Sequence, residues 1–327
     1  MKQEASFKTT KVNGRQMRPP TINTIFAIME EEELFRNLGN GEYRNIVVLT
    51  GAGVSTAAGI PDFRSPGGLF DTLRSTFGKR FPFVHDSPET ILSRDFALAH
   101  VNVYQNEIVP LLQHLGKTTM EVSPTETHRF CAWLARQGWL RRIYTQNVDG
   151  LHLHPTLDIS EDLVVECHGS VREGNLVLYG DDLPKRFYDC CDMDFSQQIG
   201  DATRNASNAN AGAPHPPVDL ILVFGTSLRV LPFSALPNLA PKNCVRVLIN
   251  RSLDDCIDYQ QCQGESSSSS SSLRIGSRKF VTTKNLWRGR EGSKRWRQLL
   301  VEGDCDCFVQ RFFSSSHFLG TSRRREV

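Results

Sequence analysis

The 327-residue sequence lacks the features that would place it among membrane, nucleic-acid-binding or disulfide-rich proteins. No apolar run approaches the roughly 20 residues that a membrane-spanning helix needs. The formal net charge is only +2, whereas nucleic-acid-binding proteins usually carry a concentrated basic face. The nine cysteines are an odd number at irregular spacings, and no secretory signal precedes them. We therefore expect an intracellular globular protein with reduced thiols that binds neither membranes nor nucleic acid directly.

The two ends of the chain read as additions to a folded domain. Residues 1–41 form a predicted N-terminal extension, with a short glutamate-rich helix over 24–38, and residues 314–327 form a basic tail. The first 29 residues are mostly basic, which faintly resembles a mitochondrial presequence, although a disordered extension is the favoured interpretation. A nuclear or cytoplasmic location is expected, with the mitochondrion as the alternative.

Short apolar segments alternate with helical patterns in the central part of the chain. Continuous apolar runs at 46–50, 220–224 and 245–249, and a fourth segment at 140–145, are typical of buried parallel strands. Helical patterning covers 96–115 and 127–137. This alternation predicts an α/β fold, a Rossmann-like parallel sheet with helices on both faces. Ligands bind such sheets at the carboxyl ends of the strands.

The first predicted strand runs into a glycine-rich loop at 51–59. Glycines at a strand-to-helix turn let backbone N–H groups approach a pyrophosphate, and the helix N-terminus adds favourable electrostatics. Thr56 stands where the dehydrogenase fingerprint requires its third glycine, so a hydride-transfer enzyme is the least favoured interpretation. A tight turn without a ligand is the alternative for this loop taken alone.

Five ordered motifs together resemble the sirtuin family. They are GIPDFRSPGGL at 59–69, TQNVDGLH at 145–152, HGS at 168–170, GTSL at 225–228 and INR at 249–251. The resemblance spans about residues 42–313, which we expect to form one catalytic domain. Within it we expect a mostly helical insertion at 66–118, a reduced small module at 169–217 and a disordered serine-rich and basic insertion at 264–292.

The resemblance implies a protein-lysine deacylase that cleaves NAD to nicotinamide and transfers the acyl group to ADP-ribose. Acylated lysines of proteins, histones among them, would be the substrates. A catalytically weak protein that binds NAD or ADP-ribose is the alternative, and mono-ADP-ribosyl transfer would use the same site.

The same resemblance assigns roles to individual residues. Phosphates would be held by Gly51, Ala52, Gly53, Ser55, Gly225, Thr226 and Ser227, and adenosine by Asn250, Arg251 and the backbone near Cys305. Gln146 and Asn147 would line the ribose, and Asp149 with Val148 would meet the carboxamide. Asp62, Phe63 and Arg64 would belong to a mobile loop over the cofactor.

Catalysis would depend on His168, assisted by Asn147. An imidazole suits a general base because its unperturbed pKa lies near neutral pH. The stretch 176–184 is similar to the strand with which the family pairs the substrate peptide, and Val177, Leu178 and Tyr179 would contact the acylated lysine. His152 and His154 match no catalytic position of the family.

The family's zinc module is missing from the expected place. Two C-x-x-C pairs need at least about 23 residues. Only residues 169–176 separate His168 from Val177, and none of them is a cysteine. We therefore predict a truncated module without zinc, since scattered thiols rarely make a tetrahedral site. A misread exon boundary is an alternative origin of this gap.

Overall fold

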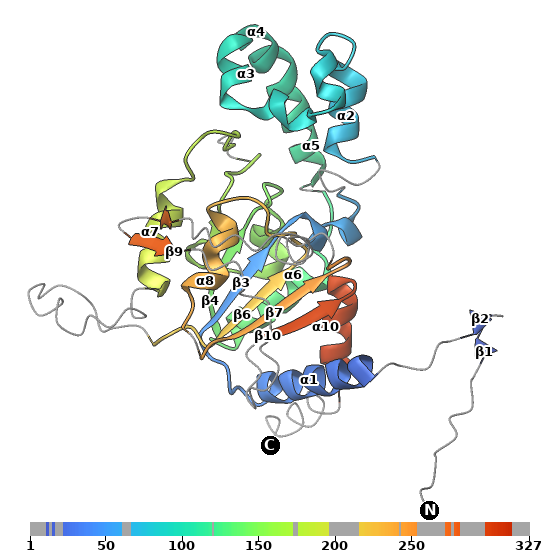
Figure 1. The fold of residues 1–327 in the computed structure, drawn as a ribbon, viewed down its shortest axis with the longest axis vertical. Coiled ribbons are helices and arrows are strands. Elements are labelled where there is room, and N and C mark those ends of the chain that lie inside the picture. Colours follow the sequence, from blue (N-terminus) through green and yellow to red (C-terminus); the bar gives the residue numbers. More distant parts are fainter. Residues whose placement is uncertain are drawn as a thin grey trace, which may run out of the picture.

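The computed structural model describes residues 11–12, 15–16, 22–60, 67–119, 121–172, 176–195, 216–241, 243–253, 272–275, 278–281 and 298–315. At its centre lies a six-stranded parallel sheet, in the order β10-β7-β6-β3-β4-β5 (Figure 1). The strands are β3 (Ile46–Thr50), β4 (Leu140–Thr145), β5 (Val164–Glu166), β6 (Leu220–Phe224), β7 (Val245–Asn250) and β10 (Gln298–Glu302).

The strand order places a break in the connectivity between β3 and β6. The chain builds outward from β3 to β5 on one side and from β6 to β10 on the other. This is the doubly wound topology, in which ligands bind beyond the carboxyl ends of the two central strands. The four predicted strands are confirmed. The sequence does not predict β10, an edge strand in which only Leu299 and Val301 are buried.

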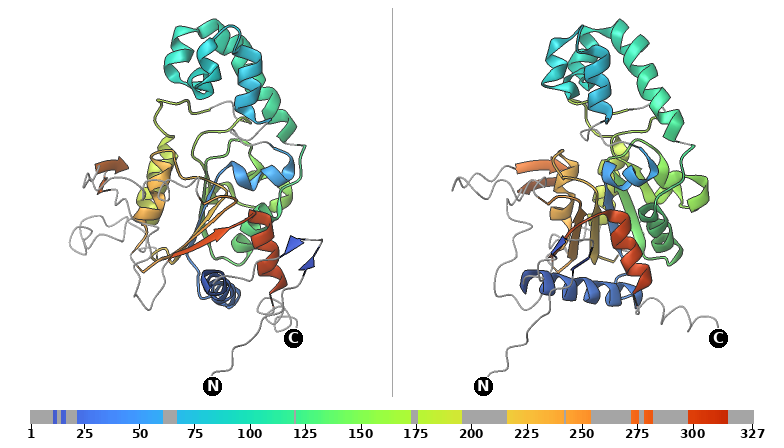
Figure 2. Two further views of the ribbon diagram at one scale, coloured as in Figure 1. Left: turned by 45° about the vertical axis from the view of Figure 1, so that its right-hand side comes forward. Right: turned by 90° about the vertical axis from the view of Figure 1, so that its right-hand side faces the viewer.

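Helices cover both faces of the sheet, as the sequence predicts. Successive residues of β3 alternate, so that Ile46 and Val48 join one apolar core and Val47 and Leu49 join the other. One face is covered by α1 (Ile22–Gly39), α6 (Glu126–Arg136) and α10 (Cys305–Ser314). The opposite face is covered by α7 (Lys185–Phe195) and α8 (Leu236–Leu239), and Figure 2 shows the layers from two further sides.

The folded domain begins earlier than position 42. Leu34, Phe35 and Leu38 of α1 are buried in the main core, and Phe35 packs edge-on against Phe308 with 5.2 Å between ring centroids. Glu31 also accepts a hydrogen bond of 2.6 Å from Nε of Arg311 in α10. Helix α1 is thus part of the folded domain, because its apolar side chains complete the core beneath α10.

A separate helical module stands above the carboxyl ends of the strands, at the top of Figure 1. It comprises α2 (Leu69–Phe77), η3 (Pro82–His85), η4 (Pro88–Leu92), α3 (Arg94–Ala99), α4 (Val101–Val103), the π-helical turn Tyr104–Ile108 and α5 (Val109–Thr119). These elements enclose a core of their own, built around Phe70, Leu73 and Phe96. The module occupies most of the segment for which a helical insertion is predicted.

Two pairs of short strands lie outside the main sheet. Near the N-terminus, β1 (Lys11–Val12) pairs antiparallel with β2 (Arg15–Gln16). Within 264–292, for which no regular structure is predicted, β8 (Ser272–Ile275) pairs antiparallel with β9 (Arg278–Val281). The expectation of disorder is wrong for these eight residues. Their low hydrophobicity suggests that the backbone N–H and C=O groups bind water, but pairing between the two strands satisfies those groups instead. The rest of that insertion lies outside the described residues.

A buried ion-pair cluster fixes α7 to the sheet. Asp194 accepts hydrogen bonds from Arg141 (3.1 Å), from Nε and Nη2 of Arg142 (2.9 and 3.0 Å) and from the hydroxyl of Tyr144 (2.7 Å). Neighbouring side chains on a strand normally point to opposite faces. A register shift beside Arg141 lets both arginines reach the same carboxylate. Only 1% of the Asp194 side chain is exposed.

We expect the substitution Asp194→Asn to lower the free energy of unfolding by about 3 kcal/mol, since it leaves two partly buried arginines without their counter-charge. The matched control is Asp189→Asn, whose partner Lys185 is exposed, and its cost should stay below about 1 kcal/mol. Urea denaturation of both variants measures the difference. Equal losses would show that the cluster does not anchor α7.

Candidate active site

The glycine loop that follows β3 forms two 3-10 turns, η1 (Ala52–Val54) and η2 (Thr56–Ala58). The expected α-helix is not formed at these positions, so the favourable field of a long helix N-terminus does not act there. The loop is tied to the neighbouring strand instead. The N–H of Gly51 donates to the carbonyl of Phe224 (3.1 Å), and the N–H of Gly53 donates to that of Gly225 (2.9 Å).

The two glycine motifs touch each other through their backbones. A Cβ atom on Gly53 would lie 2.7 Å from Cα of Gly225, and a Cβ on Gly225 would lie 2.7 Å from Cα of Gly53. Gly225 also has a φ of +59°, a region that favours glycine. Glycine is therefore required at both positions for a steric reason, which the sequence pattern alone does not reveal.

Next to this contact lies a cavity of about 550 Å³ whose lining suits a nucleotide. Its walls come from the loops after β3, β4, β6 and β7 and from the start of α10. They include Ala52, Gly53, Gln146, Asn147, His168, Gly225, Thr226, Ser227, Asn250, Arg251 and Cys305. Phosphates and ribose hydroxyls accept hydrogen bonds from such groups, namely backbone amides, hydroxyls, carboxamides and a guanidinium. This donor set fits a dinucleotide.

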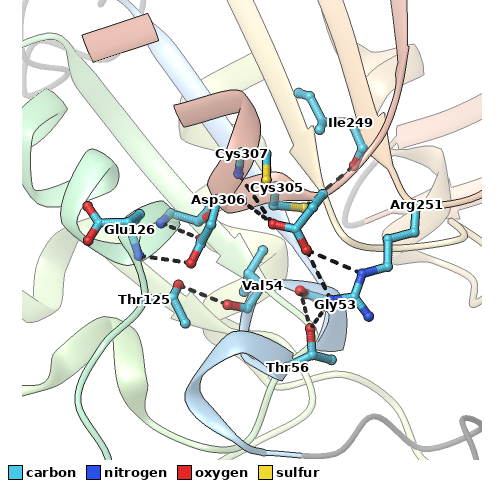
Figure 3. A network of polar contacts seen from close by, with 12 residues as sticks. Gly53, Val54, Thr56, Thr125, Glu126, Ile249, Arg251, Cys305, Asp306 and Cys307 are labelled. Atoms are coloured by element: carbon cyan, nitrogen blue, oxygen red, sulfur yellow. Dashed lines mark hydrogen bonds and ion pairs between the residues drawn. The ribbon is translucent and has the colours of Figure 1, made fainter. Parts of the chain in front are cut away.

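Arg251 connects the cavity wall to the glycine loop (Figure 3). Its Nη2 donates to Oγ1 of Thr56 (3.2 Å) and to Oδ2 of Asp304 (3.0 Å). Asp304 caps α10 by accepting from the N–H of Asp306 (2.9 Å) and of Cys307 (3.3 Å). The arginine is thus held by a fixed carboxylate at the rim of the cavity.

A second group of contacts in Figure 3 connects α10 to α6. Asp306 accepts from the N–H of Glu126 (3.2 Å) and from the N–H and hydroxyl of Thr127 (2.9 and 2.6 Å). Thr125 in turn donates its hydroxyl to the carbonyl of Val54 in the glycine loop (2.9 Å). The glycine loop, α6 and α10, which are distant in sequence, are therefore held together beside the first cavity, which we call the nucleotide-side cavity.

Three polar side chains form a partly buried hydrogen-bond network beside the glycine loop. Ser55 donates to Asp149 Oδ2 (2.6 Å) and accepts from Nδ2 of Asn147 (3.1 Å). Asp149 also accepts from the N–H of Leu151 (3.0 Å). Burial raises the pKa of Asp149, while the hydrogen bonds from Ser55 and Leu151 oppose that shift. The network fixes the two residues that the sequence assigns to the ribose and the carboxamide.

His168 lies where the nucleotide-side cavity meets a second cavity, also of about 550 Å³. It lines both. Burial lowers its pKa below the ordinary value, and a hydrogen bond with the backbone of Gln146 partly opposes that shift. The ring is therefore neutral at neutral pH and has a lone pair with which to accept a proton.

The predicted substrate segment forms one wall of the second cavity, which Val177, Leu178 and Tyr179 line together with Asp149 and His168. The N–H of Val177 donates to the carbonyl of His168 (2.9 Å). Tyr179 bridges to the helical module, because its N–H donates to Leu92 (3.1 Å) and its carbonyl accepts from Arg94 (3.0 Å). The segment is held between His168 and the helical module.

The structure brings the described members of the predicted site together around these two cavities. Asp62, Phe63 and Arg64 lie outside the described residues. Several aliphatic residues of the second cavity are absent from the prediction, namely Leu69, Leu92, Leu112, Val122, Val230 and Leu231. Except for Leu69, which ends the motif at 59–69, they belong to no motif. Leu69, Leu92 and Leu112 reach the cavity from the helical module, and Val230 and Leu231 reach it from the loop after β6.

The predicted absence of zinc can be compared with the arrangement of ligand-type side chains in the described part of the chain. No three of its histidine, cysteine, aspartate and glutamate side chains come together as ligands. The bridge from His168 to Val177 is described at 169–172 and 176, and the hydrogen bond between Val177 and His168 closes it directly. Within the same described ranges, no helix combines the length and hydrophobicity required to cross a membrane.

The fold and the lining of the first cavity are those of a nucleotide-binding α/β protein, and comparisons with known proteins identify the family. The Sir2 family model matches residues 51–177. The chain is 31% identical over 242 residues to the NAD-dependent protein deacetylase sirtuin-2 of Danio rerio, covering 67% of this chain and 59% of that protein. It is 30% identical over 250 residues to the NAD-dependent protein deacetylase SIR2rp1 of Trypanosoma brucei brucei, covering 72% and 68%.

The chain belongs to the Sir2 family, the sirtuins. It spans less than two thirds of several relatives. The NAD-dependent deacetylase sir2A of Dictyostelium discoideum, 30% identical over 263 residues, is matched over 67% of this chain and 43% of its own length.

Two buried histidines pack next to the residues that hold the glycine loop, one against Thr50 and the other against Thr125. The rings of His128 and His152 lie 4.5 Å apart between centroids. His152 shares a hydrogen bond of 2.9 Å with Thr50 at the end of β3, and His128 shares one of 2.7 Å with Thr125. Burial lowers the pKa of His152 to about 3 and that of His128 well below its ordinary value. His152 has a core role, as the sequence indicates.

We predict that this pair makes the protein sensitive to acid. The unfolded chain binds a proton at His152 below a pKa of about 6.5, whereas the folded chain binds it only near 3, so stability is lost as the pH falls through this window. The contribution between pH 7 and pH 5 is about 2 kcal/mol. In denaturant titrations at both pH values, His152→Gln should reduce the loss relative to the wild type. His154→Gln, at a position nearer the surface, controls for removal of an imidazole. If the loss of stability between pH 7 and pH 5 is the same in His152→Gln as in the wild type, the assignment to His152 is wrong.

Proposed function

We propose that the chain is an NAD-dependent protein-lysine deacylase. The observation that carries this proposal is the position of His168 at the junction of two cavities, one lined by nucleotide-type donors and the other by the substrate segment. Membership of the Sir2 family supports it, because the relatives matched are named as NAD-dependent protein deacetylases. Ala52, which follows β3, and Gln146, which follows β4, line both cavities, so both cavities lie at the carboxyl ends of the strands.

The nucleotide-side cavity would hold NAD through residues of four loops. Thr226 and Ser227 with the glycine loop would bind the phosphates, and Asn250 with Arg251 would hold the adenosine end. Asn147 and Asp149 are fixed by their contacts with Ser55 and would orient the ribose and the carboxamide. Bound NAD supplies an activated anomeric carbon and nicotinamide as the leaving group.

The protein's own contribution is orientation, proton transfer and exclusion of water. His168 is neutral and partly buried, so its free ring nitrogen would accept a proton from a hydroxyl held at the junction. The segment from Leu176 to Tyr179 lines the second cavity, and Val177, Leu178 and Tyr179 would contact the acylated lysine there.

Acylated lysines of intracellular proteins, histones among them, are the substrates we propose. The described cysteines are all free thiols, which is consistent with a reducing compartment. We propose the nucleus or cytoplasm as the location, with the mitochondrion as the alternative.

We predict that nicotinamide is released from NAD only in the presence of an acetyl-lysine peptide. His168→Ala should abolish this release, with a loss of at least about 100-fold, because no other described group at the junction is an imidazole. The measurement is chromatographic quantitation of nicotinamide and deacetylated peptide.

Binding of NAD must be measured beside turnover. His154→Ala, which removes a histidine outside both cavities, should retain full activity. Binding of NAD by the wild type without peptide-dependent turnover would favour a regulatory NAD-binding protein. Label from NAD retained on protein would favour ADP-ribosyl transfer, and absorbance of a reduced nicotinamide would favour a dehydrogenase.

We also propose that the chain folds without structural zinc. Elemental analysis of the purified protein should find much less than one zinc per chain, and a chelator should leave its thermal midpoint unchanged. Cys256 and Cys262 lie outside the described residues, so stoichiometric zinc that is lost in Cys256→Ser would overturn the proposal and point to a site built from those thiols.

A further inference from the structure

The nucleotide-side cavity is lined by positive charge without negative charge. Among the described residues of its lining, Arg229 and Arg251 carry a full charge, and none is a lysine, an aspartate or a glutamate. The second cavity differs, because Asp149 and Asp181 line it and no described lining residue is an arginine or a lysine. The nucleotide-side cavity is therefore the one that suits a ligand with several phosphates.

The two arginines belong to different loops. Arg229 follows Thr226 and Ser227 in the loop after β6, and we assign those two residues to the phosphates that join the halves of the dinucleotide. Arg251 follows Asn250, the last residue of β7, and both would hold the adenosine end. Arg251 would therefore be the charged group beside the adenosine ribose.

The guanidinium of Arg251 is held in place, and part of it is left for a ligand (Figure 3). Nε and Nη2 both donate to Oδ2 of Asp304 (3.3 and 3.0 Å), and Nη2 also donates to Oγ1 of Thr56 (3.2 Å). A guanidinium has five N–H donors, and these contacts use Nε and Nη2 only. Nη1 donates to none of the residues that the structure describes, and the side chain is 63% exposed. A fixed cation thus offers the N–H groups of Nη1 at the rim of the cavity.

No described carboxylate of the cavity lining opposes a further phosphate at this place. Asp304 faces Arg251 and the N–H groups of Asp306 and Cys307, and it does not line the cavity. The lining residue after Arg251 is Ser252, whose side chain ends in a hydroxyl. In dinucleotide-binding sheets, a carboxylate beside the adenosine ribose binds the 2′-hydroxyl of NAD, whereas an arginine there accommodates the 2′-phosphate of NADP. The groups around Arg251 match the second arrangement.

We propose that the nucleotide-side cavity binds NADP as well as NAD, with Arg251 donating to the 2′-phosphate of the adenosine ribose. The inference rests on the proposed function for the orientation of the dinucleotide, but it does not require turnover. Charge-assisted hydrogen bonds are roughly twice as strong as neutral ones, so a 2′-phosphate gains more from Arg251 than a 2′-hydroxyl does. The nicotinamide ends of NAD and NADP are identical, so either dinucleotide would present the same anomeric carbon near His168.

The test is isothermal titration calorimetry of the full chain with NAD and with NADP. We expect the Kd for NADP to be no greater than the Kd for NAD, and a greater Kd for NADP would overturn the proposal. The ratio of the Kd for NADP to the Kd for NAD should rise between about 50 and 500 mM NaCl, because the added contact is made by an exposed side chain and is screened by salt. A ratio that does not change with salt would contradict the contact.

A pair of variants locates the contact. Arg251→Gln should raise the ratio of the Kd for NADP to the Kd for NAD by at least about tenfold, since it removes the cation beside the added phosphate. Arg80→Gln is the matched control, because Arg80 also pairs with a carboxylate, that of Glu107 at 2.7 Å, is 55% exposed and lines neither cavity. It should leave the ratio unchanged. An unchanged ratio in Arg251→Gln would overturn the assignment, and the salt dependence of the wild type tests the same contact if that variant does not fold.

Failure of the proposed function is detected separately, by measuring nicotinamide release from each dinucleotide in the presence of an acetyl-lysine peptide. Binding of both dinucleotides without release would overturn the deacylase function and support the inference. Release from NAD together with weaker binding of NADP would overturn the inference and support the deacylase function.

Discussion

The backbone contact between Gly53 and Gly225 is the constraint on which the site depends. It joins the loops that follow β3 and β6, the two central strands at which the sheet reverses its connectivity. A side chain at either position would collide with the backbone of the other loop. The two loops can therefore come this close only because both positions are glycine. Their approach fixes the turn that carries Ser55 and brings the carboxyl ends of the inner strands around one pair of cavities.

Charged and polar contacts then secure what surrounds this point. Thr125, Asp306, Arg251 and Asp304 hold the glycine loop against α6 and α10, and the Asp194 cluster holds α7 against β4. Thr125, Asp306 and the Asp194 cluster are partly or fully buried, where an unpaired partner would be costly, whereas the side chain of Arg251 is 63% exposed. The hydrogen bond from the N–H of Val177 to the carbonyl of His168 ties the segment at 176–179 directly to His168.

The sequence predicts β3 and β6 because each is a nearly continuous apolar run, and it predicts β4 and β7 from shorter apolar stretches that contain arginines. It misplaces the glycine-loop helix and omits β10, whose pattern is weak at a half-buried edge. The beginning of the domain is also misplaced, since the polar face of α1 conceals that Leu34, Phe35 and Leu38 are buried. Neither the pairing of His128 with His152 nor the partners of Asp194 can be predicted from spacing, because each involves elements that meet only in the folded chain.

What the sequence by itself determined is the family, because the glycine loop and the motifs at 145–152 and 168–170 are local patterns of residue types. The roles that we propose for His168, Asn147 and Asp149 follow from the same motifs. What only the tertiary structure decided is the shape of the substrate side. The helical module folds around its own core, and the gap that remains between that core and the sheet depends on how the two bodies pack. Leucines and valines carry no positional signature, so their role as cavity walls follows from packing alone.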